Sequence, residues 1–229
     1  LISMIRGWFT NPLVPAITKA HIRGDQAFIE RAVYTVTKIA WVISVFPVVM
    51  LATCAEDVLQ AYVGEAGSGL TMWLTFWMLS FMGAYLAPVT SVLFARGDLK
   101  PLVVFTLVGS SATFLLYWLL APLLNVGATV VGNVFFTLSN ILFFHLYMLR
   151  RLELSPVRLL KSAFAGPFAA AVVTGLAVWW LREVMAGYHH WPRLIASGFT
   201  GLIVYAGLIF SLVMKPDEFK RYVSEIRGV

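Results

Sequence analysis

The stretch TVTKIAWVISVFPVVMLATC, residues 35–54, is apolar enough to cross a bilayer, yet it carries a lysine, Lys38, near its start. About 20 predominantly apolar residues form a helix that spans a hydrocarbon core of ~30 Å. A charged side chain inside that core is costly. Lys38 therefore either reaches water at the membrane surface or has a function within the membrane.

The composition predicts a membrane protein along the whole length of the chain. Of its 229 residues, 60% are hydrophobic and only 12% are charged, whereas soluble domains average about 25% charged residues. Continuous apolar runs favour helices over the strands of a β-barrel, in which apolar positions alternate. We therefore predict an all-α polytopic membrane protein built as a helical bundle.

Polar breaks divide the apolar runs into a partial helix and six full spans. The partial helix covers about 1–22, and the spans lie near 28–55, 68–96, 99–120, 126–150, 156–184 and 192–214. The sequence starts with Leu1 inside an apolar run, without the basic region and short apolar core of a signal peptide. We expect the chain to be part of a longer protein.

The charges of the polar breaks alternate from one break to the next. One set contains Lys19, Arg23, Arg31, Arg96, Lys100, Arg150, Arg151, Arg158, Lys161, Lys215, Lys220, Arg221 and Arg227. The other set contains only Arg182 and Arg193. Because cytoplasmic loops carry an excess of Lys and Arg, the first set and the C-terminal tail are predicted to be cytoplasmic.

Signatures of an enzyme are missing from the sequence. It contains neither a Gly-rich phosphate loop nor a His-x-x-x-His pair, and a single cysteine, Cys54, excludes an intrachain disulfide and a Cys-based zinc site. We expect Cys54 to be a small buried thiol, and we predict no catalytic residue, no metal and no cofactor. Glu56 and Asp57 follow the first full span, where solvent is their simplest partner. The net charge of +6 is not taken as evidence for a nucleic-acid partner.

Two cations within apolar runs are the candidate site residues. If the hydrocarbon begins near Val36, Lys38 lies only ~3 Å deep, and its flexible stem can carry the ammonium group back to the headgroups. Arg6 precedes Lys19 by 13 residues, or ~20 Å of helix, so it cannot reach that surface. Arg6 either reaches the opposite surface or faces the bundle interior, where a guanidinium suits an anion such as a phosphate.

Prolines and small residues mark the shapes and contacts of the spans. Pro47, Pro88 and Pro167 interrupt helix hydrogen bonding, and they are either ordinary kinks or hinges of a transporter. Small residues at four-residue spacing predict a close contact with another helix, and they are Ala163, Pro167, Ala171 and Gly175.

Three segments in a fixed order resemble those of a known family. VPAITKAHIRGDQAFIERA (14–32) resembles the cytoplasmic segment of polysaccharide flippases, and GAYLAPVTSVLFARGDLKP (83–101) is similar to their helix with a central proline. CAEDVLQAYVG (54–64) occupies the place of a short outer segment of that family. The family is the polysaccharide (O-antigen-type) flippase group of the multidrug/oligosaccharidyl-lipid/polysaccharide exporter superfamily. Asn125 departs from it, because it stands where the outer-loop motif of the family has its first glycine.

The resemblance implies the C-terminal half of a two-lobe transporter in the bacterial inner membrane. Residues 1–150 would form the C-terminal lobe, with a partial first helix and four spans. Residues 151–229 would form two additional transmembrane helices and a cytoplasmic tail. The implied function is the flipping of a polyprenyl-diphosphate-linked glycan, a lipopolysaccharide (O-antigen) precursor, by alternating access. Its partners would be that glycan, membrane lipid and a missing N-terminal lobe, and Arg6 and Lys38 would bind the diphosphate.

Two other kinds of protein remain as alternatives. A multidrug/cation antiporter of the same superfamily needs intramembrane carboxylates, and the six spans show none away from their ends. A membrane polymerase or ligase acting on lipid-linked glycans needs a large outer loop, whereas the longest outer break has only about a dozen residues.

Overall fold

The chain is an all-α polytopic membrane protein. The computed structural model describes residues 13–213, apart from the side chains of residues 13, 65, 66, 68 and 84–87. In this range six helices are long and apolar enough to cross a membrane, and they are Gln26–Thr53, Thr71–Arg96, Lys100–Leu124, Val126–Arg151, Pro156–Val184 and His190–Val213. The six predicted spans are confirmed, with ends close to those expected from hydropathy.

The helical segments follow one another with short connections. The first half contains α2 (Leu13–Ile22), α3 (Gln26–Thr53), α4 (Ala55–Val63), the 3₁₀ segment η1 (Gly64–Leu70), α5 (Thr71–Ser80), the 3₁₀ segment η2 (Phe81–Leu86) and α6 (Ala87–Arg96). The second half contains α7 (Lys100–Leu124), α8 (Val126–Phe143), η3 (Phe144–Met148), α9 (Leu149–Arg151), α10 (Pro156–Leu159), η4 (Leu160–Phe164), α11 (Ala165–Val184), α12 (His190–Leu208) and η5 (Ile209–Val213). The last three η segments are π-helical.

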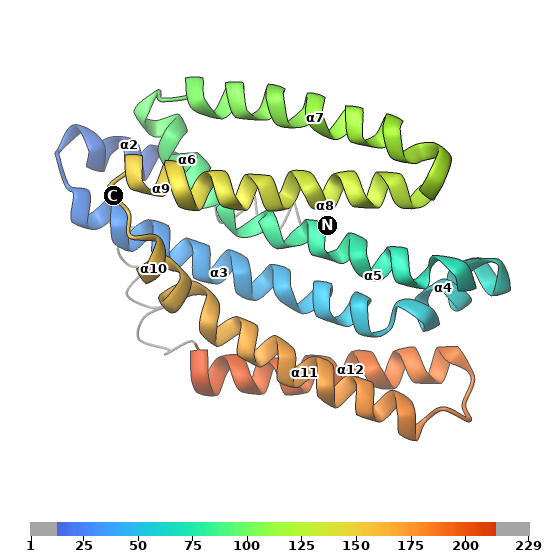
Figure 1. Ribbon diagram of the computed structural model, residues 1–229. Coiled ribbons are helices and arrows are strands. Elements are labelled where there is room, and N and C mark those ends of the chain that lie inside the picture. Colours follow the sequence, from blue (N-terminus) through green and yellow to red (C-terminus); the bar gives the residue numbers. More distant parts are fainter. Residues whose placement is uncertain (1–12, 214–229) are drawn as a thin grey trace.

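The long helices lie side by side in the order α7, α8, α5–α6, α3, α11, α12 (Figure 1). α3 is central, because it contacts α5 and α6 on one side and α11 on the other. α7 lies at the edge and packs mainly against α8. The stacked rings of Phe105 on α7 and Phe143 on α8, with centroids 4.1 Å apart, join these two helices.

Three helices, α2, α6 and α9, end in the same kind of turn at one end of the bundle. The sequence Arg-Gly-Asp occurs at 23–25 and at 96–98, and both glycines have a positive φ, of 70° and 68°. In each turn the glycine N–H bonds three residues back and the aspartate N–H five residues back, which defines a Schellman motif. The turn after α9 has the same pattern of bonds, but Glu153 occupies the glycine position with φ 60°.

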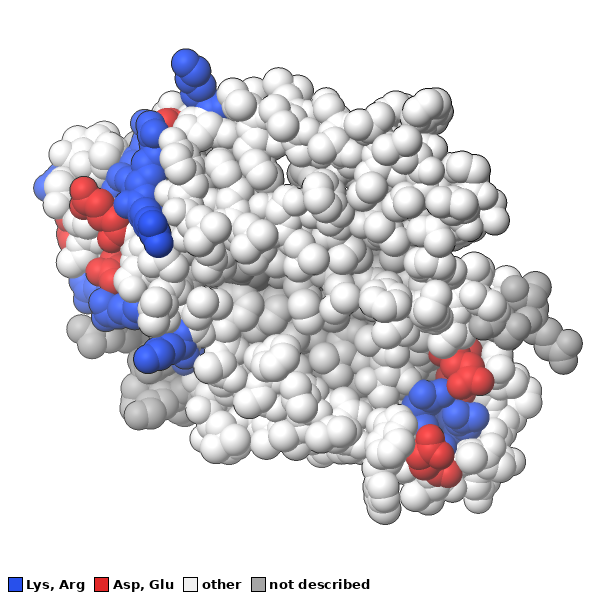
Figure 2. All heavy atoms as spheres, in the orientation of Figure 1, with Lys and Arg blue, Asp and Glu red and all other residues white. Residues whose placement is uncertain are grey.

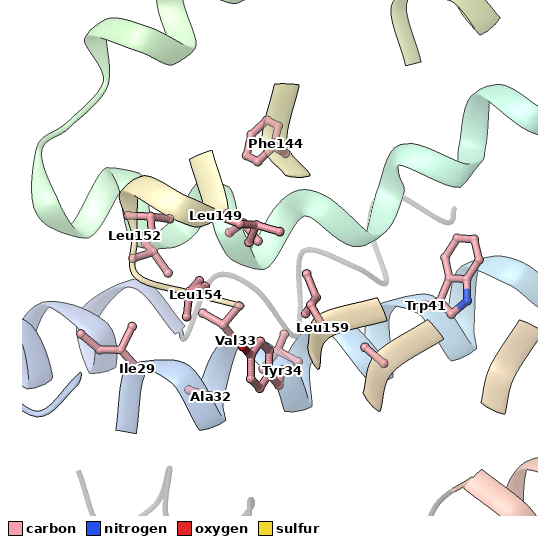
Figure 3. Packing of buried hydrophobic residues seen from close by; sticks show 14 of the residues in the cluster. Ile29, Ala32, Val33, Tyr34, Trp41, Phe144, Leu149, Leu152, Leu154 and Leu159 are labelled. Atoms are coloured by element: carbon pink, nitrogen blue, oxygen red, sulfur yellow. The ribbon is translucent and has the colours of Figure 1, made fainter. Parts of the chain in front are cut away.

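The largest cluster of buried residues lies near this end, between α3 and the α9–α10 connection. In Figure 3, Ile29, Val33 and Tyr34 of α3 lie beneath the leucines of residues 149–159. Farther along α3, the ring of Trp41 packs against Phe164 with centroids 4.5 Å apart. In lipid, helices associate through such close packing, since there is no water to exclude between them.

The small-residue ridge forms the predicted helix contact. Ala163 and Ala171 are buried, with 0% and 1% of their surface exposed. A Cβ atom on Gly175 would lie 3.1 Å from Cγ1 of Val49, which belongs to α3. α11 therefore approaches α3 closely through this ridge, and larger side chains there would push the two helices apart.

The three prolines stand in different local structures. α3 continues as one helix through Pro47. The Tyr205 hydroxyl of α12 donates to the carbonyl of Val42, 2.7 Å away, one residue before the carbonyl that Pro47 leaves without its helical donor. Pro88 follows the 3₁₀ segment η2, and Pro167 follows the π-helical segment η4. Their assignment as hinges stays a prediction.

On the face that Figure 2 shows, charged residues gather at the two ends of the bundle and leave an uncharged band between them. At the end with the three Schellman turns, the described cations are Lys19, Arg23, Arg31, Arg96, Lys100, Arg150, Arg151, Arg158 and Lys161. The opposite end contains Arg182 and Arg193. We call these the basic end and the sparse end. The predicted division of the breaks into two sets is therefore a division between two ends of the structure.

Candidate functional site

Lys38 lies on the central helix and is half-buried. It is four residues beyond Tyr34, so both side chains lie on one face of α3, about 6 Å apart along its axis. Tyr34 already takes part in contacts at the basic end. Lys38 is therefore one helical turn deeper in the bundle than the last of those contacts.

A polar collar surrounds the start of α3 at that end. The Tyr34 hydroxyl accepts a hydrogen bond from the Ser155 N–H at 3.1 Å and donates to its carbonyl at 3.3 Å. Gln26 donates to the Leu152 carbonyl at 3.0 Å and accepts from Arg96 at 2.8 Å. An ion pair of 2.8 Å joins Arg158 to Glu30. The collar residues are Gln26, Glu30, Tyr34, Arg96, Leu152, Ser155 and Arg158.

Two buried hydroxyl groups continue the polar character of α3 beyond the collar. Thr37 and Ser44 have 0% and 1% of their surface exposed, and neither hydroxyl has a hydrogen-bond partner among the described residues. They are seven residues apart and so lie on nearly the same face of the helix. Buried polar groups normally find partners. Thr37 and Ser44 thus form a buried polar face of this span, and Lys38 lies about 100° around the helix from Thr37.

Of the two predicted site residues, the structure places only Lys38. Arg6 lies outside the described residues 13–213. The juxtaposition of Arg6 and Lys38 around one anion therefore stays a prediction from the sequence.

The prediction that solvent surrounds Glu56 and Asp57 is wrong for Asp57. This carboxylate has 0% of its side chain exposed and lies between two arginines. Its Oδ2 atom is 2.6 Å from Nε of Arg182, and its Oδ1 atom is 3.3 Å from a terminal nitrogen of Arg193. Arg182 also donates to the Thr53 carbonyl and pairs with Glu56 at 3.3 Å. Glu56 itself is half-exposed, with 53% of its side chain accessible.

We call Glu56, Asp57, Arg182 and Arg193 the sparse-end cluster. Its ion pairs connect helices. Two guanidinium groups face two carboxylates, so the cluster is neutral and offers no excess charge to an anion or a cation. It joins α4 to α11 and α12, which supply Asp57, Arg182 and Arg193 respectively. A buried carboxylate of this kind requires its partners, because removing one leaves an uncompensated buried charge.

The sequence contained a signal for the sparse-end cluster. Arg182 and Arg193 are the only cations of the sparse set of breaks, and Asp57 follows a span that ends on that same side. Charges of opposite sign at one membrane level, next to apolar spans, have few other partners. The pairing of Asp57 with Arg182, 125 residues away, was not predicted. Two neighbouring carboxylates at the end of a helix are typical of a solvent-exposed position.

Cys54 lies next to the cluster, between α3 and α4. It has 3% of its surface exposed, as expected of a small buried thiol. Burial raises the pKa of this thiol, although the nearby Arg182 opposes that rise. Among the described residues, no three His, Cys, Asp or Glu side chains come together in a way that could hold a metal ion.

Comparison of the chain with protein-family models, with curated proteins and with solved structures gives no match.

Proposed function

We propose that this chain is part of a transporter that flips a polyprenyl-diphosphate-linked glycan across the bacterial inner membrane by alternating access. The three polar side chains inside the α3 span are the observation that carries the proposal. A half-buried lysine and two buried hydroxyl groups follow one another inside a span of 28 residues. Ionisable residues within a membrane span are costly, and they typically mark the pathway of a substrate or an ion.

The position of Lys38 suits a diphosphate that enters from the basic end. The collar brings cations to that end, and Lys38 stands one turn farther in. An anionic headgroup would first meet the arginines of the collar and then the ammonium group, which offers three hydrogen-bond donors on a flexible stem. Arg6, in the role that the family resemblance implies, would hold the diphosphate with a planar fork.

The described carboxylates favour this substrate over the cation of an antiporter. Within the six spans of the described range, the acidic side chains are Glu30 and Glu183, each near the end of its span. The fully buried Asp57 is neutralised by two arginines. Neither arrangement leaves a free negative charge for Na⁺ or H⁺ in mid-membrane among the residues that the structure describes.

Substitutions at Lys38 and Arg6 test the proposal in cells that depend on the full protein for surface glycan. Lys38→Gln should lower glycan export, and Lys38→Arg should be nearly silent because it keeps the charge. Arg6→Ala should abolish export, and Arg6→Lys should restore only part of it, since lysine lacks the planar fork. Surface glycan is measured together with the amount of each variant in the membrane.

Lys161→Gln is the matched control, because Lys161 is an exposed cation of the basic end. It should export normally. Wild-type export by both Lys38→Gln and Arg6→Ala, at normal membrane abundance, would eliminate the diphosphate site. Normal glycan export combined with loss of drug resistance in the same variants would favour the antiporter instead.

A further inference from the structure

A pocket of about 570 Å³ lies between α7 and the α8–α9 helix at the basic end. Its walls are apolar and include Val104 and Val108 of α7. The stacked rings of Phe105 and Phe143 lie where the two helices meet. The polar lining residues of the pocket come from 98–100, at the α6–α7 turn, and from 147–151, and we call this part of the pocket the mouth. The pocket is therefore amphipathic along the axis of the bundle.

The mouth has an excess of positive charge. Arg151 binds Asp98 with two contacts, of 2.6 and 3.2 Å, and it also donates to the Tyr147 hydroxyl at 3.2 Å. Asp98 is thereby neutralised. Lys100 lines the same mouth, is exposed, and forms no ion pair with any residue that the structure describes. The three charges leave a net charge of +1.

The backbone adds to this attraction for anions. α7 begins at Lys100, and no side chain caps its first turn. Pro101 has no N–H, so the backbone N–H of Lys100 and the positive end of the helix dipole are the features that favour a negative group nearby. Lys100 and Pro101 of this turn both line the pocket. A phosphate at the mouth would meet an ammonium group and a helix N-terminus together.

The apolar part of the pocket is long enough for the upper part of an acyl chain. From Lys100 to Val108 the helix rises about 12 Å. The neighbouring surface of α7 is also apolar, since Val103 and Leu107 are more than half-exposed. In a membrane this surface faces lipid tails, and the basic end lies at the level of the headgroups. A molecule that fits has an anionic head at the mouth and a hydrocarbon chain below it.

We propose that this pocket binds one anionic phospholipid of the leaflet at the basic end. Its phosphate lies by Lys100 and the start of α7, and one acyl chain lies along Val104, Phe105 and Phe143. The excess positive charge selects anionic over zwitterionic headgroups, since a zwitterionic lipid brings its own cation to the mouth. The proposal does not depend on which substrate the protein transports.

Native mass spectrometry of the full chain, purified in a neutral detergent, tests this site. The chain is titrated with phosphatidylglycerol and with phosphatidylcholine of the same acyl chains. The first phosphatidylglycerol should bind roughly tenfold more tightly than phosphatidylcholine. Lys100→Gln should remove most of this difference, and Lys100→Arg should keep it. Val104→Trp should weaken the binding of both lipids, because the indole fills the pocket.

Two control variants separate this site from lipids bound elsewhere on the surface. Lys161→Gln removes another exposed cation of the basic end, and Val172→Trp enlarges an exposed side chain of α11. Both should bind phosphatidylglycerol like the wild type. Equal loss in the controls, equal affinity for the two lipids in the wild-type chain, or an unchanged preference in Lys100→Gln would each overturn the proposal. Displacement of phosphatidylglycerol by equimolar inorganic phosphate would instead show a site for free anions.

Discussion

At the residue scale, the turn after α9 holds an amino acid that its backbone does not favour. Glu153 has φ 60° at the position where the two other Schellman turns of the basic end have Gly24 and Gly97. Left-handed backbone costs an L-residue roughly 1–2 kcal/mol, and glycine adopts it without this cost. Asn125, between α7 and α8, also has a positive φ of 49°, but its ψ of −119° lies outside the left-handed helical region.

Glu153→Gly should therefore stabilise the protein by about 1 kcal/mol. The side chain is exposed and has no hydrogen bond or ion pair among those that the structure describes, so little is lost with it. The measurement is the midpoint of thermal unfolding in detergent, which should rise. Glu153→Ala is the matched control, because it removes the same carboxylate but keeps the Cβ atom. A rise of equal size in the alanine variant would refute the backbone explanation.

At the scale of the elements, the sparse-end cluster holds the α11–α12 hairpin against α4. Asp57→Asn should destabilise the protein by roughly 3–5 kcal/mol, because Arg193 would lose its counter-charge and Arg182 would keep only the half-exposed Glu56. Glu56→Gln removes a half-exposed partner of the same Arg182 and should cost at most about 1 kcal/mol. Thermal unfolding of both variants in detergent measures the difference. Similar costs for the two substitutions would mean that the burial of Asp57 contributes little.

Hydropathy and length were enough to predict the membrane spans. The local helix geometry and the surroundings of Lys38 depend on contacts between distant segments and could not be predicted. The span 156–184 has the same ends in the prediction and in the structure. The close helix contact at the small-residue ridge was also predictable from the sequence, since close approach of two helices in a membrane requires small side chains. The π-helical segments and the 3₁₀ segment η2 were not predicted, because packing against neighbouring helices decides them. The position of Lys38 relative to the collar required the contact between Tyr34 and Ser155.

At the scale of the whole molecule, the two ends differ in charge, and the basic end is predicted to face the cytoplasm. Single cysteines introduced at exposed positions can test this orientation. His21→Cys lies at the basic end, and His189→Cys lies in the α11–α12 turn. A membrane-impermeant maleimide should label the second variant in spheroplasts, and the first only in inverted vesicles. The opposite result would reverse the orientation of every span.

The wild-type chain serves as the unlabelled control for that experiment. Its single cysteine, Cys54, is buried, and burial raises the pKa of the thiol. Because the thiolate is the reactive form, a raised pKa lowers the reactive fraction at neutral pH. Strong labelling of the wild type would show that Cys54 is accessible and would contradict its burial between α3 and α4.

The wide turns at 144–148 and 160–164 change the phase of the helices that contain them. Each π turn takes in one residue more than an α turn, so every side chain beyond it points about 100° away from where a regular helix would aim it. A one-residue deletion within such a segment would shorten the span by only ~1.5 Å, which a bilayer tolerates. It would nevertheless swing all the following side chains toward a different neighbour. In these two spans, the number of residues matters more for which face meets which helix than for reaching across the membrane.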